Sequence, residues 1–124
     1  MTPPVRVLIA DDHRLFAEAL EAVLATEERI EVVGRASDGG EAVALARALR
    51  PDVVALDISM PVMDGFEAAE QLELLEDPPA VLMLTGSSAP EDVARARAVG
   101  VKGYITKDAI AASLVDAILA AAGR

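Results

Sequence analysis

The chain has 124 residues, a length that fits one compact domain, and its 21 acidic and 11 basic residues give a formal net charge of −10. Such a negative field repels phosphate backbones, so we expect no direct contact with nucleic acid. The absence of cysteine and the single histidine, His13, exclude disulfides, thiolate metal sites and multi-histidine zinc sites. No apolar run approaches the roughly 20 residues that span a bilayer, and no secretion signal precedes the first run, so we expect a cytoplasmic protein without membrane contact.

Five short apolar runs alternate along the chain with five segments of helical periodicity. The runs cover residues 5–10, 30–36, 52–57, 80–85 and 101–106. The first, third and fourth are almost continuously apolar, which is typical of central parallel strands covered on both faces. The second alternates between apolar and polar residues and the fifth contains Lys102, which favours edge positions. The pattern predicts one α/β domain, a (βα)5 unit whose open parallel sheet carries helices on both faces.

Three of the helical segments carry their own start signals. The spacing of a capping box, an N-cap side chain followed three residues later by Glu, occurs at Asp38/Glu41, Asp64/Glu67 and Ser88/Glu91. The apolar positions of the first helical segment include Phe16 and Leu20, at the interval that places them on one helix face. These signals support the assignment of helices between the strands.

Polar side chains follow the ends of four predicted strands. Asp11 and Asp12 come after the first strand, Asp57 ends the third, Thr85 ends the fourth and Lys107 follows the fifth. In an open parallel sheet, ligands bind beyond the carboxyl ends of the strands, so these side chains are expected to converge. Three carboxylates packed together repel one another, so either some are protonated or a cation neutralises them. Oxygen ligands favour a hard cation such as Mg2+.

A carboxylate in such a site can attack phosphorus and form an aspartyl phosphate. Phosphoryl transfer needs positioning and charge neutralisation, which Mg2+, Lys107 and the Thr85 hydroxyl could supply. Each residue alone has an ordinary structural interpretation, as a helix cap, an Asx-turn, a strand end or a surface lysine. Their coincidence at the appropriate strand ends favours a functional site.

Over essentially its full length the sequence resembles the receiver domain of two-component response regulators. The resemblance rests on "DD" after the first run, "DISMPVMDG" around Asp57, "LTGSS" at the fourth run and "GYITKD" at the fifth. "ADDHRLFAEAL" and "GYITKD" are most similar to the NarL/FixJ type, whose receivers usually precede a helix-turn-helix DNA-binding domain. The resemblance implies a flavodoxin-like fold with strand order 2-1-3-4-5, and one receiver domain over residues 1–124 with no output domain in this chain.

The same resemblance implies a role for each acidic residue. Asp57 would accept a phosphoryl group from a sensor histidine kinase. Asp12, Asp57 and the backbone carbonyl of Ser59 would bind Mg2+, and Asp11 would act mainly through a bound water. His13 matches the start of the first helix in the NarL/FixJ type, so we expect a helix-start position for it rather than a catalytic role.

Three further residues would respond to the phosphoryl group. Lys107 would contact it, Thr85 would hydrogen-bond it, and Tyr104 would move inward as Thr85 is drawn toward the phosphate. Ser59 and Ser87, two positions beyond Asp57 and Thr85, are small and neutral and are expected to shield the phosphate poorly from water. Gly65 is expected to give clearance at the start of the third helix.

We therefore predict a receiver, activated by phosphorylation, that switches an output surface and regulates transcription through a DNA-binding domain or an effector protein. It is a phosphoacceptor with slow self-dephosphorylation rather than a conventional enzyme. The expected output surface comprises the fourth and fifth helices with the fifth strand, the first and fifth helices being the alternative; a homodimer formed on phosphorylation is left open.

Three other functions compete with this prediction. A single-domain receiver could act by protein–protein contact alone. A pseudo-receiver that never carries phosphate is disfavoured, because such domains usually lose one of the acids, the threonine or the lysine. An aspartate-nucleophile phosphatase typically needs a second acid two residues after the nucleophile, where this chain has Ser59.

Overall fold

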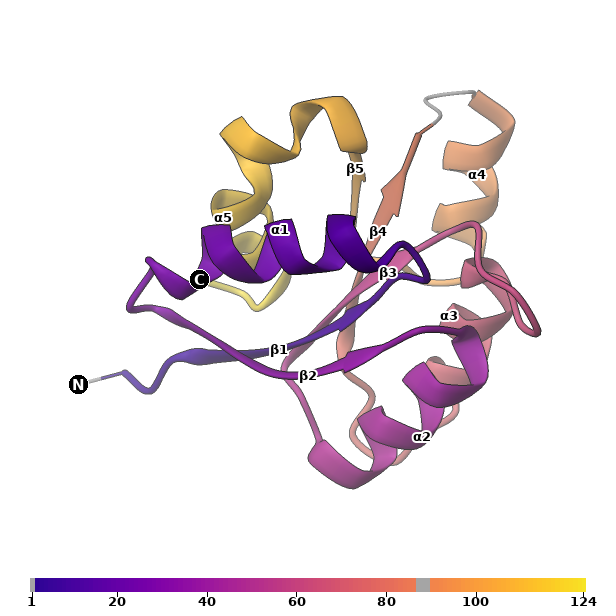
Figure 1. Ribbon diagram of the computed structural model, residues 1–124. Coiled ribbons are helices and arrows are strands. Elements are labelled where there is room, and N and C mark those ends of the chain that lie inside the picture. Colours follow the sequence, from indigo (N-terminus) through magenta and orange to yellow (C-terminus); the bar gives the residue numbers. More distant parts are fainter. Residues whose placement is uncertain (1, 87–89) are drawn as a thin grey trace.

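The computed structural model describes residues 2–86 and 90–124 and contains one five-stranded parallel sheet (Figure 1). The strands are β1 (Val5–Ala10), β2 (Ile30–Ala36), β3 (Val53–Asp57), β4 (Ala80–Thr85) and β5 (Gly103–Thr106). Their order is β2-β1-β3-β4-β5, which confirms the predicted α/β fold and places the second and fifth strands at the edges. Neighbouring strands all pair in parallel.

Helices cover both faces of the sheet, in two layers that Figure 1 separates clearly. The helices are α1 (Arg14–Ala25), α2 (Gly39–Leu49), α3 (Gly65–Glu73), α4 (Pro90–Ala98) and α5 (Ile110–Ala121), with a short 3-10 helix, η1 (Lys107–Ala109), before α5. Residues of α1 and α5 share one buried cluster with the sheet, and residues of α2, α3 and α4 share the other. None of the described helices is long and apolar enough to cross a membrane.

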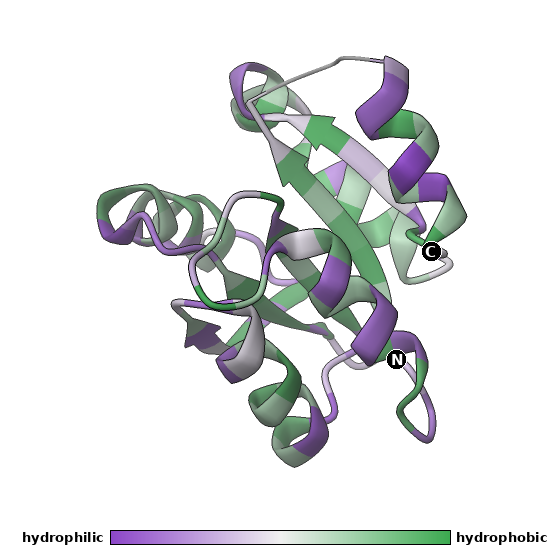
Figure 2. Cartoon of the chain, turned by 90° about the vertical axis from the view of Figure 1, so that its right-hand side faces the viewer, coloured by the Kyte–Doolittle hydropathy of each residue, from purple (hydrophilic) through white to green (hydrophobic). Residues whose placement is uncertain are grey.

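The two buried clusters explain why the central strands are almost continuously apolar. Along β1, Val7 and Ile9 face the α1/α5 layer, whereas Leu8 and Ala10 face the layer of α2, α3 and α4. Successive side chains of a strand point to opposite faces, so a strand covered on both sides needs apolar residues at every position. Figure 2 shows hydrophobic residues concentrated on the strands, with hydrophilic residues interspersed along the helices.

Two predicted helix starts are confirmed by capping hydrogen bonds. The Asp38 carboxylate accepts from the Glu41 amide at 2.8 Å, and the Asp64 carboxylate accepts from the Glu67 amide at 2.9 Å. Each bond satisfies one of the amides that a helix leaves unpaired in its first turn. The third predicted cap, Ser88, lies outside the described residues, as does Ser87.

Candidate functional site

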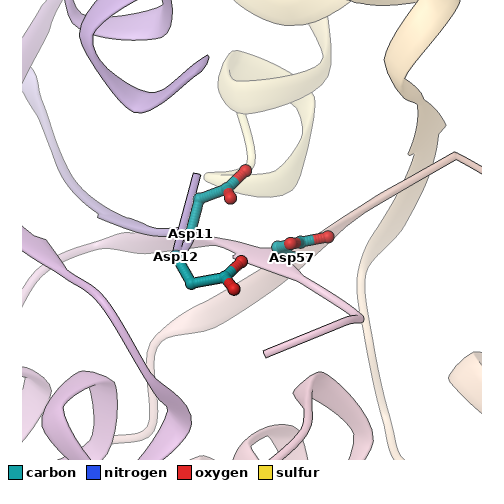
Figure 3. Close-up of side chains that lie close together, drawn as sticks. All are labelled: Asp11, Asp12 and Asp57. Atoms are coloured by element: carbon teal, nitrogen blue, oxygen red, sulfur yellow. The ribbon is translucent and has the colours of Figure 1, made fainter. Parts of the chain in front are cut away.

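The three acidic residues singled out from the sequence lie together at the carboxyl edge of the sheet (Figure 3). Asp11 and Asp12 follow β1 and Asp57 ends β3, and each offers a carboxylate oxygen within 4.8 Å of the others. β1 and β3 are neighbours in the sheet, and the strand order reverses between them. Open α/β sheets bind ligands at such a point. Asp11 and Asp57 are buried, at 3% and 4% exposure, whereas Asp12 is exposed.

Lys107 brings one positive charge to this acidic cluster. It begins η1, directly after β5, and its Nζ lies 3.3 Å from Asp11 Oδ2 and 3.5 Å from Asp57 Oδ1. The ammonium therefore bridges the two buried carboxylates. Because the cluster holds three carboxylates and Lys107 adds one ammonium, the four groups together carry an excess of negative charge when all are ionised.

The burial of Asp57 has a direct electrostatic consequence. Desolvation raises the pKa of the Asp57 carboxyl from 3.8 to about 6, and the negative charge of Asp11 adds to this rise, while the Lys107 ammonium and the Ser59 amide oppose it. The Ser59 amide donates a hydrogen bond to Asp57 Oδ1 at 3.4 Å. A cation bound beside Asp57 would offset both effects by favouring the ionised carboxylate, so the three carboxylates form a group that could hold one.

Asp11 and Asp12 differ in what their oxygens already contact. Asp11 Oδ1 accepts a hydrogen bond from the His13 amide at 2.8 Å, and its Oδ2 faces Lys107. Within the described parts of the chain, the Asp12 carboxylate has no hydrogen bond or ion pair. Figure 3 shows the two side chains leaving adjacent positions in different directions. Asp12 is therefore the carboxylate of the pair that is available to a new ligand. His13 stands at the N-cap of α1 and its side chain makes no capping bond.

Thr85 lies on β4, the strand next to β3, and Tyr104 lies on β5, one strand further toward the edge of the sheet. Thr85 ends β4, one residue beyond the Leu84 that pairs with Asp57, and it is 4% exposed. Tyr104 lies on β5, pairs with Met83 of β4 and packs against the buried cluster on the side of α2, α3 and α4. The structure thus brings Thr85 to the same edge of the sheet as Asp57, while Tyr104 lies two positions earlier along its strand than the Thr106 that pairs with Thr85.

The loop after Asp57 is held against the strand end by Gly65. A Cβ at this position would lie 2.4 Å from the Asp57 carbonyl oxygen and 2.6 Å from the Ile58 Cα, both backbone atoms. The Gly65 amide donates to the Ile58 carbonyl at 2.8 Å. The predicted clearance at the start of α3 is therefore confirmed, and it fixes the place of Ser59 beside the acidic cluster.

A solvent-open depression of about 500 Å³ gives access to the acidic cluster. Its walls include Asp12, Ser59, Met60, Pro61 and Arg95. A larger cavity of about 800 Å³ lies elsewhere, lined by Glu28, Arg29, Asp116 and Arg124 among others. We assign the chemistry to the smaller depression, because it alone of the two adjoins buried, closely spaced ionisable groups.

Sequence reasoning missed one residue of the site. The ring of Phe16 lies with its centre 4.4 Å from Lys107 Nζ, although its position in the helical pattern of α1 indicated only a core residue. The contact joins the first helix to the residue after the last strand. A local sequence pattern cannot predict contact between residues so far apart in the chain.

A family model described as the response regulator receiver domain matches residues 7–119. The chain belongs to this family. The receiver domain is similar to the transcriptional regulatory protein LiaR of Bacillus subtilis, with 40% identity over 117 residues that cover 94% of this chain and 56% of LiaR. It is also 41% identical, over 111 residues, to protein-glutamate methylesterase/protein-glutamine glutaminase 2 of Anaeromyxobacter dehalogenans, covering 90% of this chain and 32% of that protein.

Among solved structures, the receiver domain is similar to the signal receiver domain of the response regulator NarL from Mycobacterium tuberculosis. The TM-score is 0.94 at 37% identity, and 98% of each chain is covered. These similarities confirm the NarL-type resemblance read from the sequence. The chain spans about half the length of the curated transcription regulator LiaR and about a third of the methylesterase.

Proposed function

We propose that Asp57 accepts a phosphoryl group from the phosphohistidine of a sensor kinase and that phosphorylation changes the surface offered to an output partner. The observation that supports this most directly is the buried Asp57 carboxylate, which lies beside the Lys107 ammonium and close to two further acids. Family membership gives the context, because the chain is a receiver domain of a two-component response regulator.

The cluster fits a bound Mg2+, because its donors are all oxygens and its carboxylates outnumber its cations. Asp12, Asp57 and the Ser59 backbone carbonyl would hold the ion directly. Asp11 would act through a water, since its Oδ1 and Oδ2 already contact the His13 amide and Lys107. When bound, the ion neutralises charge on the phosphoryl oxygens as a Lewis acid.

In the proposed step, the phosphohistidine enters through the open depression, and a carboxylate oxygen of Asp57 attacks its phosphorus atom. A P–O bond forms, the P–N bond of the phosphohistidine breaks, and the imidazole leaves with its electron pair. Lys107, already 3.5 Å from Asp57 Oδ1, turns its ammonium toward a phosphoryl oxygen, and the Thr85 hydroxyl donates a hydrogen bond to another. Tyr104 then moves inward and alters the surface formed by α4, β5 and α5.

The proposed role of the receiver includes its location and its partners in the cell. The receiver is a phosphoacceptor rather than an enzyme in its own right. It hydrolyses its own phosphate slowly, and the small Ser59 shields that phosphate poorly from water. It works in the cytoplasm with a histidine kinase and with an output DNA-binding domain or effector protein. Similarity to a transcription regulator favours this output over a receiver that acts alone.

The decisive experiment treats the protein with acetyl phosphate and Mg2+ and follows the intact mass. One phosphoryl group should be added, and its addition should require Mg2+. The Asp57→Asn variant should gain none, whereas Asp116→Asn, the same change at an exposed position of α5, should be phosphorylated normally. A mass increase that persists in Asp57→Asn would overturn the assignment, and no increase in the unaltered protein would favour a phosphate-independent pseudo-receiver.

A further inference from the structure

The Lys107 ammonium has a third neighbour besides the two buried carboxylates. Its Nζ lies 4.4 Å from the centre of the Phe16 ring, 3.3 Å from Asp11 Oδ2 and 3.5 Å from Asp57 Oδ1. Phe16 belongs to α1 and packs, partly buried, against the cluster that α1 and α5 share with the sheet. The ring is therefore fixed by the core on the side of α1 while it contacts the ammonium.

The two kinds of neighbour respond differently to the chemistry of the site. The carboxylates change their charge environment when a cation binds or when Asp57 gains a phosphoryl group, so their attraction for Lys107 changes too. The ring does not change. The face of an aromatic ring carries negative electrostatic potential and attracts an ammonium without adding a full negative charge to an already repulsive cluster.

An aliphatic residue at this position would fill the same space but would not attract the ammonium. The flexible lysine side chain has many rotamers, and ordering it costs conformational entropy. A ring that holds the ammonium near Asp57 in every state of the site reduces the ordering still required when the phosphoryl group arrives. Lys107 is then already in place to neutralise charge as it develops.

We propose that Phe16 is a positioning residue, whose ring face holds the Lys107 ammonium at Asp57 and thereby speeds phosphoryl transfer. This inference rests on the proposed phosphorylation of Asp57. It assigns to α1 a part in the chemistry that goes beyond its packing in the core.

The test weakens the ring's attraction without changing its shape. Site-specific incorporation of phenylalanine with one, two and three ring fluorines at position 16 withdraws electron density from the ring face stepwise. The rate of phosphorylation by acetyl phosphate with Mg2+ should fall at each step, to about two- to fivefold below the unmodified rate with three fluorines.

The chain offers a matched control, because it contains only two phenylalanines. Phe66 is buried and also lies under a cation, with Arg95 4.1 Å from its ring centre, and both residues line the depression beside the acidic cluster. Any effect of the same fluorine series at position 66 should therefore not depend on Lys107, and should be equal in the unaltered protein and in Lys107→Met. In a Lys107→Met background, where the slower basal rate is measured first, the series at position 16 should have no further effect.

A second measurement reads the contact without reference to activity. The chain has two lysines, so protein carrying 13C-labelled lysine gives two ε-methylene signals, and Lys102 serves as the internal reference. The Lys107 signal should be shifted upfield by the ring, should lose that shift in Phe16→Leu and should keep it in Phe16→Tyr.

The outcomes separate the two proposals. A flat fluorine series at position 16 in protein that is phosphorylated normally, or a loss at position 16 that persists in Lys107→Met, would refute the role of Phe16 and leave the function of Asp57 intact. A Lys107 signal that does not respond to Phe16→Leu would refute the contact itself. Failure of the unmodified protein to accept phosphate on Asp57 would refute the proposed function.

Discussion

Replacing Asp57 by asparagine should stabilise the metal-free protein at neutral pH. Asp57 is 4% exposed, and its burial, with the charge of Asp11, raises the pKa of its carboxyl from 3.8 to about 6. Asparagine has nearly the same shape and no charge, so it resembles the protonated acid. The variant therefore removes the cost of holding an ionised carboxylate in a buried, negatively charged site.

The magnitude follows from the pKa values. Because the folded pKa is raised, the folded state binds the proton more tightly than the unfolded chain, and stability falls as pH rises from 3.8 through about 6. Above this window the ionised Asp57 costs about 3 kcal/mol relative to its neutral form. Asp57→Asn should therefore raise the free energy of unfolding by up to about 3 kcal/mol at pH 7.5, and the gain should fall to roughly half by pH 5.

The assay is urea unfolding followed by far-ultraviolet circular dichroism, in buffer containing a chelator. Asp116→Asn, at an exposed position, should change the free energy of unfolding by no more than about 0.5 kcal/mol. Mg2+ at ten times its dissociation constant should then stabilise the unaltered protein by about 1.4 kcal/mol. It should not stabilise Asp57→Asn. An Asp57→Asn variant that is less stable than the unaltered protein at pH 7.5, or a gain that does not shrink toward pH 5, would refute the electrostatic reasoning.

Three further perturbations test other parts of the site. Asp12→Ala should weaken Mg2+ binding in calorimetric titration more than Asp11→Ala does, because Asp11 is already engaged by a backbone amide and an ammonium; equal losses would contradict this division. Thr85→Ala should still accept phosphate, but the single tyrosine, Tyr104, should lose its phosphorylation-dependent change in ring NMR signals; an unchanged response would exclude Thr85 as the relay. Gly65→Ala should lower the free energy of unfolding by about 3 kcal/mol in urea titration, because its Cβ would meet backbone atoms at 2.4 and 2.6 Å; a change below about 0.5 kcal/mol would show that the loop can move aside.

The fold was predictable because each element satisfies its own local rule. The central strands are apolar at successive positions because helices cover both of their faces, and Asp38 and Asp64 occupy the N-caps that their spacing indicates. The exact ends were not predictable. Lys102 was expected in the fifth strand, yet β5 begins at Gly103, even though the Lys102 amide bonds to the Val81 carbonyl at 2.8 Å. Such ends depend on pairing between strands, which a single run does not encode.

The site was predictable only as far as topology decides it. The positions of the strand ends predicted which side chains lie close together, and the acidic residues and Lys107 do lie close together. The loop after Asp57 contains a feature that runs against local preference: Val62 has a φ of 68°, and the Met63 amide bonds to the Pro61 carbonyl across it at 2.7 Å. Valine is disfavoured in this left-handed region, so tertiary context rather than local sequence imposes the turn.

Lys107 gives a physical reason for the separation of roles between the paired acids. Its ammonium lies near the inner carboxylate, Asp11, while the outer one, Asp12, remains exposed toward the depression. A cation that entered by that route would meet Asp12 first and would compete with Lys107 for Asp11. If Asp57 is phosphorylated as proposed, the phosphoryl group would draw the ammonium away from Asp11, and Asp11 would then attract the cation more strongly. Phosphorylation and cation binding would then reinforce each other through this one lysine, and the Phe16 ring would limit how far it can move.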